Sequence, residues 1–285
     1  MTLPEYLLLI AALIFGFGGT AWLTKRYDLR RPNFLGRRIP SVAGLTFVLG
    51  GEFFYACEWL SQGMKTSLAG VYLLATLGFG ALGLLDDLKG DRSTGGFRGH
   101  FQALKQGSLT TGAVKAIGGG ILSLIAGYLI TLPGPLWSAA LAALLIALSA
   151  NTLNLFDLRP GRCLFGFFAG ALVIFLVLLR QHAVGVGELF WIAVVFAVIL
   201  YPLDSGGAAM LGDTGSNAFG AVLGVAGAVF FAPLWQGVLV VLLLALQIWC
   251  ERHSLTQFIE THPLLRALDS KLGVRAQADS AEVGR

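Results

Sequence analysis

Apolar runs of about twenty residues recur along the whole chain, and short polar connections separate them. A helix of that length crosses the hydrocarbon core of a membrane, which is about 30 Å thick. The pattern therefore predicts an all-α polytopic membrane protein with about nine transmembrane helices. The predicted spans cover residues 3–24, 40–60, 67–85, 112–132, 135–157, 163–180, 187–203, 214–232 and 234–250.

Composition agrees with this fold class. Of the 285 residues, 56% are hydrophobic and only 13% are charged, whereas a soluble domain carries about 25% charged residues. The 38 glycines suit close packing of helices in lipid. Cys57, Cys163 and Cys250 lie in or beside apolar runs without metal-ligand or disulfide spacing, so we interpret them as packing residues. The first run is too long for a signal-peptide core, and we expect a retained span.

The positions of the basic residues predict the orientation in the membrane. We place the N-terminus outside, so that the connections after the first, third, fifth and seventh spans face the cytoplasm together with the C-terminal tail. Of the 20 Lys and Arg residues, all but Lys65 and Arg180 then lie on the cytoplasmic side. The pI of 9.1 is therefore a signal of topology and not of nucleic-acid binding.

The chain divides into a transmembrane helical domain, residues 1–250, and a cytoplasmic amphipathic tail, residues 251–285. In the tail, Leu, Ile and Phe recur at near-helical spacing among charged residues. Such segments lie in the membrane interface. Pro263 is expected to break the tail into two short helices.

Polar clusters at the predicted cytoplasmic ends of the spans are functional candidates, because ionisable groups are costly in or near the bilayer. The first cluster is Asp86–Asp87, with Asp91 nearby. Adjacent carboxylates repel one another unless a cation lies between them, and Mg²⁺ accepts one or two carboxylates. The alternative is a helix end that returns to water, with Lys89 balancing the charge.

The second cluster follows one stripe of a predicted helix, where Asn151, Asn154 and Asp157 are each three residues apart. Amides suit the recognition of sugar hydroxyls or base edges, since they both donate and accept hydrogen bonds. Arg159 and Arg162 follow directly and could grip a diphosphate. Their alternative role is to snorkel to anionic headgroups.

The third cluster is the run from Gly212 to Asn217, in which Asp213 could hold a metal while backbone amides at a helix start meet phosphate oxygens. An ordinary helix cap is the alternative. The fourth is basic and comprises Lys105, Lys115, Arg37 and Arg38. Lys115 is either a surface anchor or a phosphate ligand that faces the aspartates.

Glu52 is the remaining carboxylate within a predicted span. It is either a proton-relay residue or a residue directed toward the outer interface.

The motifs GLLDDLKGD, NTLNLFD and MLGDTGSN occur in this order at predicted cytoplasmic helix ends. Together with the early run Asn33–Pro40, they resemble the polyprenyl-phosphate N-acetylhexosamine-1-phosphate transferase superfamily over roughly residues 30–225. The resemblance implies an Mg²⁺-dependent enzyme, with Mn²⁺ as an alternative ion, in the bacterial inner membrane. Its implied substrates are a nucleotide-sugar such as a UDP-sugar and a polyprenyl phosphate, and a homodimer is expected.

The resemblance implies a role for each matched residue. Asp213 and one of Asp86 and Asp87 would hold the metal, while the other would orient the nucleophile or deprotonate its minor monoanion. Lys115 would lie near the phosphates, and Asn151, Asn154 and Asp157 would hold the nucleoside or sugar. Beyond the matched residues, we expect Arg159 and Arg162 to help stabilise charge on the diphosphate. We also expect Gly212 and Arg38 to contact substrate.

This chain departs from the family pattern in two places and resembles a divergent member. Asp157 is followed by Leu-Arg-Pro-Gly-Arg, where the family has a glycine and a further Asp-Gly pair. The tail has only His253 and His262, where the family has a histidine-rich loop. The alternatives are a transporter or flippase for a lipid-linked intermediate and a catalytically inactive family member.

Overall fold

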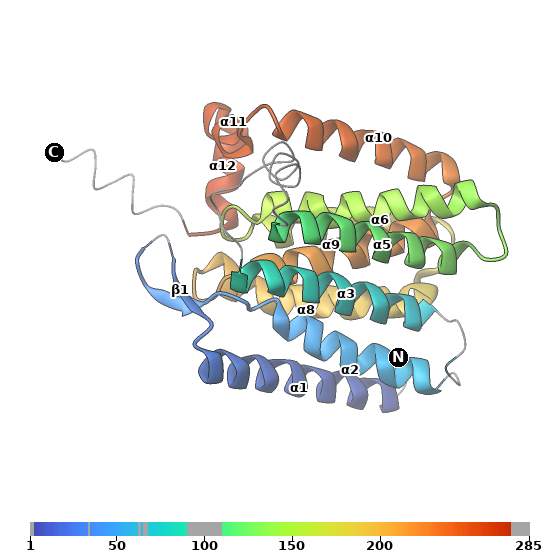
Figure 1. Ribbon diagram of the computed structural model, residues 1–285, viewed down its shortest axis with the longest axis horizontal. Coiled ribbons are helices and arrows are strands. Elements are labelled where there is room, and N and C mark those ends of the chain that lie inside the picture. The colour runs from blue at the N-terminus through green and yellow to red at the C-terminus, as the bar shows by residue number, and fades with distance from the viewer. Residues whose placement is uncertain (1–2, 34, 62–63, 65–67, 90–109, 275–285) are drawn as a thin grey trace.

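The computed structural model describes residues 3–33, 35–61, 64, 68–89 and 110–274. Asp91, Lys105 and the last residues of the tail, 275–285, lie outside this part of the chain. The structure is an all-α, multi-pass membrane protein, as the apolar pattern predicts. All nine predicted apolar runs are helical, and their helices run side by side along one direction (Figure 1).

The predicted spans correspond to α1 (Leu3–Tyr27), α2 (Leu45–Ser61), α3 (Leu68–Lys89), α5 (Thr111–Thr131), α6 (Leu136–Phe156), α7 (Arg162–Arg180), α8 (Glu188–Ser205), α9 (Gly212–Phe230) and α10 (Pro233–Cys250). In the described part of the chain, 7 of these helices are long and apolar enough to cross a membrane. The exceptions are α2, which has 17 residues, and α9, which begins with a polar turn. The number of spans and their orientation stay predictions.

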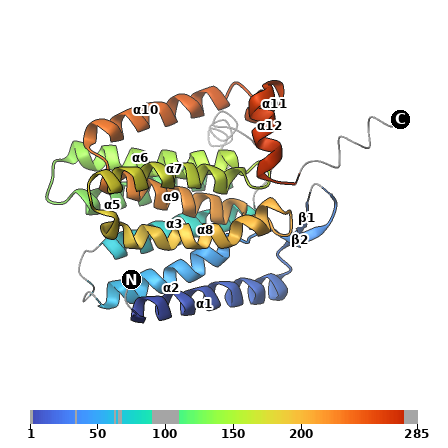
Figure 2. The same ribbon diagram turned by 180° about the vertical axis from the view of Figure 1, so that it is seen from behind.

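Helix α9 is the centre of the bundle, while α1 and α10 lie at opposite edges (Figures 1 and 2). Nearly every residue of α9 is buried, because its Gly and Ala residues let neighbouring backbones come close. A Cβ atom at Gly220 would lie 2.6 Å from Ala150 Cα of α6. Phe219 of α9 stacks on Phe47 of α2, with ring centroids 4.2 Å apart.

Helix α10 is attached to the bundle by two buried glutamines, and its other faces are largely apolar and exposed. Gln236 Nε2 donates to the carbonyls of Ala228 and Phe231, each at 2.9 Å. Near the other end, Gln247 Nε2 donates to Leu148 O of α6 at 3.0 Å. Such bonds hold a helix in lipid, where burial of apolar surface gives no driving force.

A short antiparallel hairpin, β1 (Arg30–Pro32) and β2 (Arg38–Pro40), extends from one end of the bundle (Figure 1). The end of β2 and the residues after it pair with the loop before α9, since Met210 N donates to Pro40 O at 2.8 Å. Gly44 N likewise donates to Leu211 O at 2.9 Å. These bonds fix the backbone that leads into α9.

The tail forms α11 (Leu255–Thr261) and α12 (Pro263–Leu272), and the break falls at Pro263 as predicted. Both helices lie at the end of the bundle that carries the hairpin, opposite to the start of α1 (Figure 2). A single 3-10 turn, Val184–Gly187, joins α7 to α8 at the other end.

Close packing between α6 and α9 leads to a stability prediction. We expect Gly220→Ala to destabilise the protein by about 1–3 kcal/mol, because the new methyl group would meet α6 backbone that cannot give way easily. Gly237→Ala on α10 is the matched control, since a Cβ atom there has no neighbour within 4 Å. Unfolding in detergent measures both variants, and equal melting points would contradict the packing argument.

Candidate active site at the helix ends

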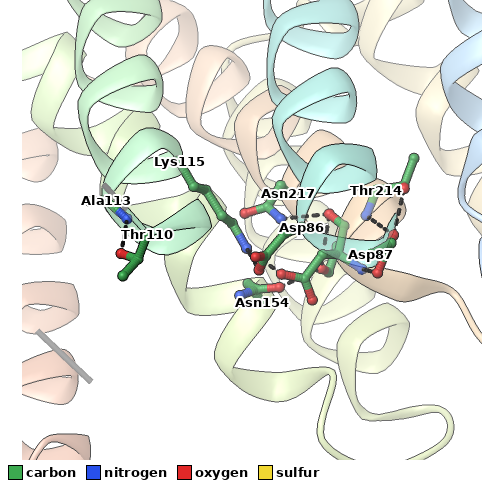
Figure 3. Close-up of polar contacts among 10 residues, drawn as sticks. Asp86, Asp87, Thr110, Ala113, Lys115, Asn154, Thr214 and Asn217 are labelled. Carbon is green, nitrogen blue, oxygen red and sulfur yellow. Dashed lines mark hydrogen bonds and ion pairs between the residues drawn. The ribbon is translucent and has the colours of Figure 1, made fainter. Parts of the chain in front are cut away.

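Four helices each contribute one polar side chain to a compact group, which we call the Asp–Lys cluster. Its members are Asp86 at the end of α3, Lys115 in α5, Asn154 in α6 and Asp213 in the first turn of α9. Figure 3 shows the side chains of Lys115 and Asn154 directed toward the aspartates. The cluster lies at the end of the bundle that carries the hairpin and the tail.

Lys115 joins the two carboxylates of the cluster. Its Nζ atom donates to Asp213 Oδ2 and lies 3.8 Å from Asp86 Oδ2 (Figure 3). The three side chains are between 16% and 29% exposed. Partial burial weakens solvent screening, so these pairs are stronger than pairs on an open surface.

The amide of Asn154 completes the cluster. In the orientation that satisfies all its neighbours, the side-chain nitrogen donates to Ser216 Oγ at 2.9 Å and to Asp213 Oδ1 at 3.1 Å. The side-chain oxygen then accepts from Lys115 Nζ at 3.0 Å. Asn154 therefore contacts both the acidic and the basic member of the group.

Asp87 has a different task from its neighbour Asp86. Its Oδ1 atom accepts from Asp213 N at 2.9 Å, and Oδ2 accepts from Thr214 N at 2.9 Å and from Thr214 Oγ1 at 2.6 Å (Figure 3). The first N–H groups of a helix have no partner within the helix, and Leu211 at the N-cap provides none. Asp87 of α3 therefore caps α9 from outside.

This cap corrects the expectation that amides at the start of α9 face phosphate oxygens. The N–H groups of Asp213 and Thr214 donate to a carboxylate of the protein, because that carboxylate lies directly at the helix start. Gly212 makes the approach possible, since its φ of +74° favours glycine and a Cβ atom there would lie 2.8 Å from Asp87 Oδ2.

The other members of the second predicted motif lie beside the cluster. Asn151 is partly buried one turn before Asn154, and Asp157 is the C-cap of α6. Burial raises the pKa of the Asp157 carboxyl well above its usual range, and the carboxylates of Asp204 and Asp213 raise it further. The structure thus brings Asp157 into the electrostatic field of the site.

The structure places the predicted arginines away from the Asp–Lys cluster. Arg162 is buried and donates hydrogen bonds to the carboxylate of Asp269 in α12. Because these donors are occupied, the expectation that Arg162 grips a diphosphate is wrong for this conformation. Arg159 pairs with Glu260 at 3.2 Å on the surface, and its proposed contact with substrate stays a prediction. Arg38 lies in β2 and pairs with Asp28 at 2.8 Å.

Asp204 near the end of α8 is a residue that sequence analysis missed. It is 5% exposed, and its two oxygens accept from Gly161 N at 2.8 Å and from Leu211 N at 3.2 Å. It therefore ties the α6–α7 turn to the loop before α9. The sequence does carry a signal for it: Asp204 is a lone carboxylate near the end of an apolar run, and Ser205 and two glycines follow it.

The donor set suits a hard divalent cation in part. Asp86 and Asp213 contact the same ammonium group, and Mg²⁺ accepts one or two carboxylates while water and phosphate oxygens complete its shell. Within the described residues, no three His, Cys, Asp or Glu side chains form a ready metal cage. Asp86 and Asp213 could therefore hold Mg²⁺ together with a phosphate, and Asp87 is engaged as a cap.

Searches of protein-family models and of curated proteins find no match to this sequence. The chemistry of the site therefore has to be inferred from residue types, their geometry and the order of the motifs.

Different roles for the two adjacent aspartates predict different effects on stability. Asp87→Asn should destabilise the protein by about 1–2 kcal/mol, because an amide replaces an acceptor-only cap with a group that also carries donors. Asp86→Asn is the matched control and should leave stability nearly unchanged, because the weaker attraction to Lys115 at 3.8 Å is offset by relief of the repulsion from Asp213. Unfolding in detergent measures both. A loss in Asp86→Asn as large as that in Asp87→Asn would contradict the assignment.

Proposed function

We propose that this protein transfers (N-acetyl)hexosamine-1-phosphate from a UDP-sugar to a polyprenyl phosphate. The products are a polyprenyl-diphosphate sugar and UMP. The observation that carries the proposal is the Asp–Lys cluster, in which Lys115 pairs with Asp86 and Asp213 at helix ends beside Asn154. The ordered motifs in the sequence support the same assignment.

In the proposed reaction, a phosphate oxygen of the lipid attacks the β-phosphorus of the UDP-sugar. A bond forms between that oxygen and phosphorus, and the bond from the β-phosphorus to the bridging oxygen breaks as UMP leaves. A phosphate monoester is mostly dianionic at neutral pH, so little proton transfer is needed. Positioning and neutralisation of charge then supply most of the catalysis, as in other phosphoryl transfers.

Each member of the cluster, and the neighbouring Asp87 and Asp157, has a task in this reaction. Lys115 neutralises developing charge on the diphosphate, while Asn154 and Asp157 orient the sugar or nucleoside. Asp86 and Asp213 would hold Mg²⁺, or Mn²⁺ in its place, and the bound ion would neutralise phosphate oxygens. Asp87 keeps α9 in place and thereby fixes the position of Asp213.

An apolar cavity within the bundle is compatible with a lipid substrate. It has a volume of about 240 Å³ and lies between α6, α7, α9 and α10. Its lining includes Leu153 and Phe156 of α6, Leu223 of α9 and Leu243 of α10. Leu153 and Phe156 lie within one turn of Asn154 along α6, so one end of the cavity reaches the part of α6 that carries Asn154.

The proposed setting is the cytoplasmic side of a bacterial inner membrane. The basic hairpin and the tail lie at the same end of the bundle as the cluster (Figure 1). Basic residues accumulate on the cytoplasmic side of membrane proteins, where soluble UDP-sugars are also found. A homodimer remains part of the expectation from family resemblance.

Transport of a lipid-linked intermediate is a second candidate, and Glu52 of α2 is the observation that favours it. The Oε1 atom of Glu52 is buried and has no hydrogen-bond partner within the described residues. Transporters bind substrate near the bilayer midplane, whereas the Asp–Lys cluster lies at helix ends. An inactive family member is the third candidate, and measuring catalysis separates both from the transferase.

Release of UMP tests the proposed function directly. We expect purified protein in detergent to release UMP from one member of a panel of UDP-sugars, and only when undecaprenyl phosphate and Mg²⁺ are both present. Asp213→Asn should abolish release, because it removes a carboxylate that would hold the ion. Chelation with EDTA should have the same effect, and added Mg²⁺ should restore activity.

Glu188→Gln is the control for this experiment, because it makes the same chemical change at the opposite end of the bundle. Asp213→Asn that is folded and as active as the unmodified protein would exclude the assigned role. Folded, unmodified protein that releases no UMP with any UDP-sugar would contradict the transferase and favour transport or binding.

Lys115→Met should lower the rate of UMP release by about 10²–10³-fold, because it keeps an unbranched side chain of similar length but removes the ammonium group and its charge. The dependence on Mg²⁺ should persist, since both carboxylates remain. Steady-state kinetics of UMP release measures the change. A loss below about threefold would assign Lys115 to structure alone.

A further inference from the structure

A buried ion pair holds the tail against the end of the bundle that carries the Asp–Lys cluster. Arg162, the first residue of α7, is 5% exposed, and its Nε and Nη2 atoms donate to the two carboxylate oxygens of Asp269 at 2.5 and 2.8 Å. Its Nη1 atom donates to Thr256 Oγ1 of α11 at 3.1 Å. A bidentate pair of this kind fixes the relative orientation of the two side chains. Removal of one partner leaves an uncompensated buried charge, which strongly destabilises the protein.

Backbone contacts place the end of α12 directly on the α6–α7 turn, residues 157–162. Gly161 has a φ of +81°, and a Cβ atom there would clash with Leu272 O. Val274 N donates to Ser205 O at 2.8 Å, and Tyr201 Oη donates to Leu272 O at 3.0 Å. The tail is thus built into the bundle at this point (Figure 2).

The α6–α7 turn is connected to the site on both sides. Before it, α6 carries Asn154 of the cluster and ends at Phe156, with Asp157 as its C-cap. Within it, Gly161 N donates to Asp204, whose other oxygen accepts from Leu211 N. Leu211 directly precedes the first turn of α9, which carries Asp213. Movement of the turn would therefore shift Asn154 of α6 and Asp213 of α9 relative to each other.

We propose that Asp269 is a positioning residue of the site, which acts through Arg162 to hold the α6–α7 turn and, through Asp204, the loop that leads to Asp213. The tail then completes the active site without touching substrate. The effect on catalysis rests on the proposed transferase function, whereas the effect on the backbone does not.

Hydrogen–deuterium exchange of the full chain in detergent tests the backbone effect. Asp269→Asn presents amide donors to the donors of Arg162, and we expect exchange at Gly161 and Leu211 to rise by about tenfold or more. Glu260→Gln is the matched control, because it makes the same change in the exposed pair with Arg159. It should leave exchange at both positions unchanged.

The same variant connects the backbone effect with catalysis. If the unmodified protein releases UMP, Asp269→Asn should raise KM for the UDP-sugar by about tenfold with a smaller change in kcat. The reason is that the residues of α6 and α9 that would bind the substrate are no longer held in fixed relative positions. If the unmodified protein has no activity, that result contradicts the proposed transferase function and leaves the positioning role of Asp269 untouched. The exchange measurement decides the positioning role by itself.

Tyr201→Phe keeps the proposal testable if Asp269→Asn fails to fold. It removes one hydrogen bond between α8 and the end of α12, so exchange at Gly161 and Leu211 should rise by a smaller factor. The proposal is overturned if the folded variants exchange at Gly161 and Leu211 as the unmodified protein does. It is also overturned if exchange rises equally along all helices, since that result indicates general destabilisation.

Discussion

The start of α9 is the constraint on which the site depends. The first N–H groups of a helix have no acceptor within the helix, and Leu211 at the N-cap of α9 provides none, so the buried start of α9 needs an acceptor from another element. Asp87 of α3 accepts from the N–H groups of Asp213 and Thr214 and thereby fixes the ends of two helices against each other. Since Asp86 is the neighbour of Asp87, the same contact brings Asp86 toward Asp213.

Charge balance is the second condition for this arrangement. Asp86 and Asp213 would repel each other in a partly buried setting, and Lys115 offsets that repulsion by pairing with both. The group has two negative charges and one positive charge, so its net charge is −1. This net negative charge favours the binding of one further cation together with an anionic substrate. A divalent ion that brings phosphate ligands meets this requirement in the proposed reaction.

The amino-acid pattern predicts the helices well, because a membrane demands long apolar runs whose backbone bonds are satisfied internally. It also indicates that Asp86, Lys115, Asn154 and Asp213 lie at helix ends. It does not distinguish Asp86 from Asp87, since their roles depend on where α9 begins in space. The partner of Arg162 was unpredictable for the same reason: Asp269 is 107 residues away along the chain.

Asp204 explains how distant parts of the sequence act on one site. Its two oxygens bind Gly161 N and Leu211 N, so one buried side chain sets the distance between the α6–α7 turn and the start of α9. The tail contacts the same turn through the pair of Arg162 with Asp269. A site assembled from helix ends has few loops to support it, and buried polar side chains therefore supply the rigidity that the proposed reaction would require.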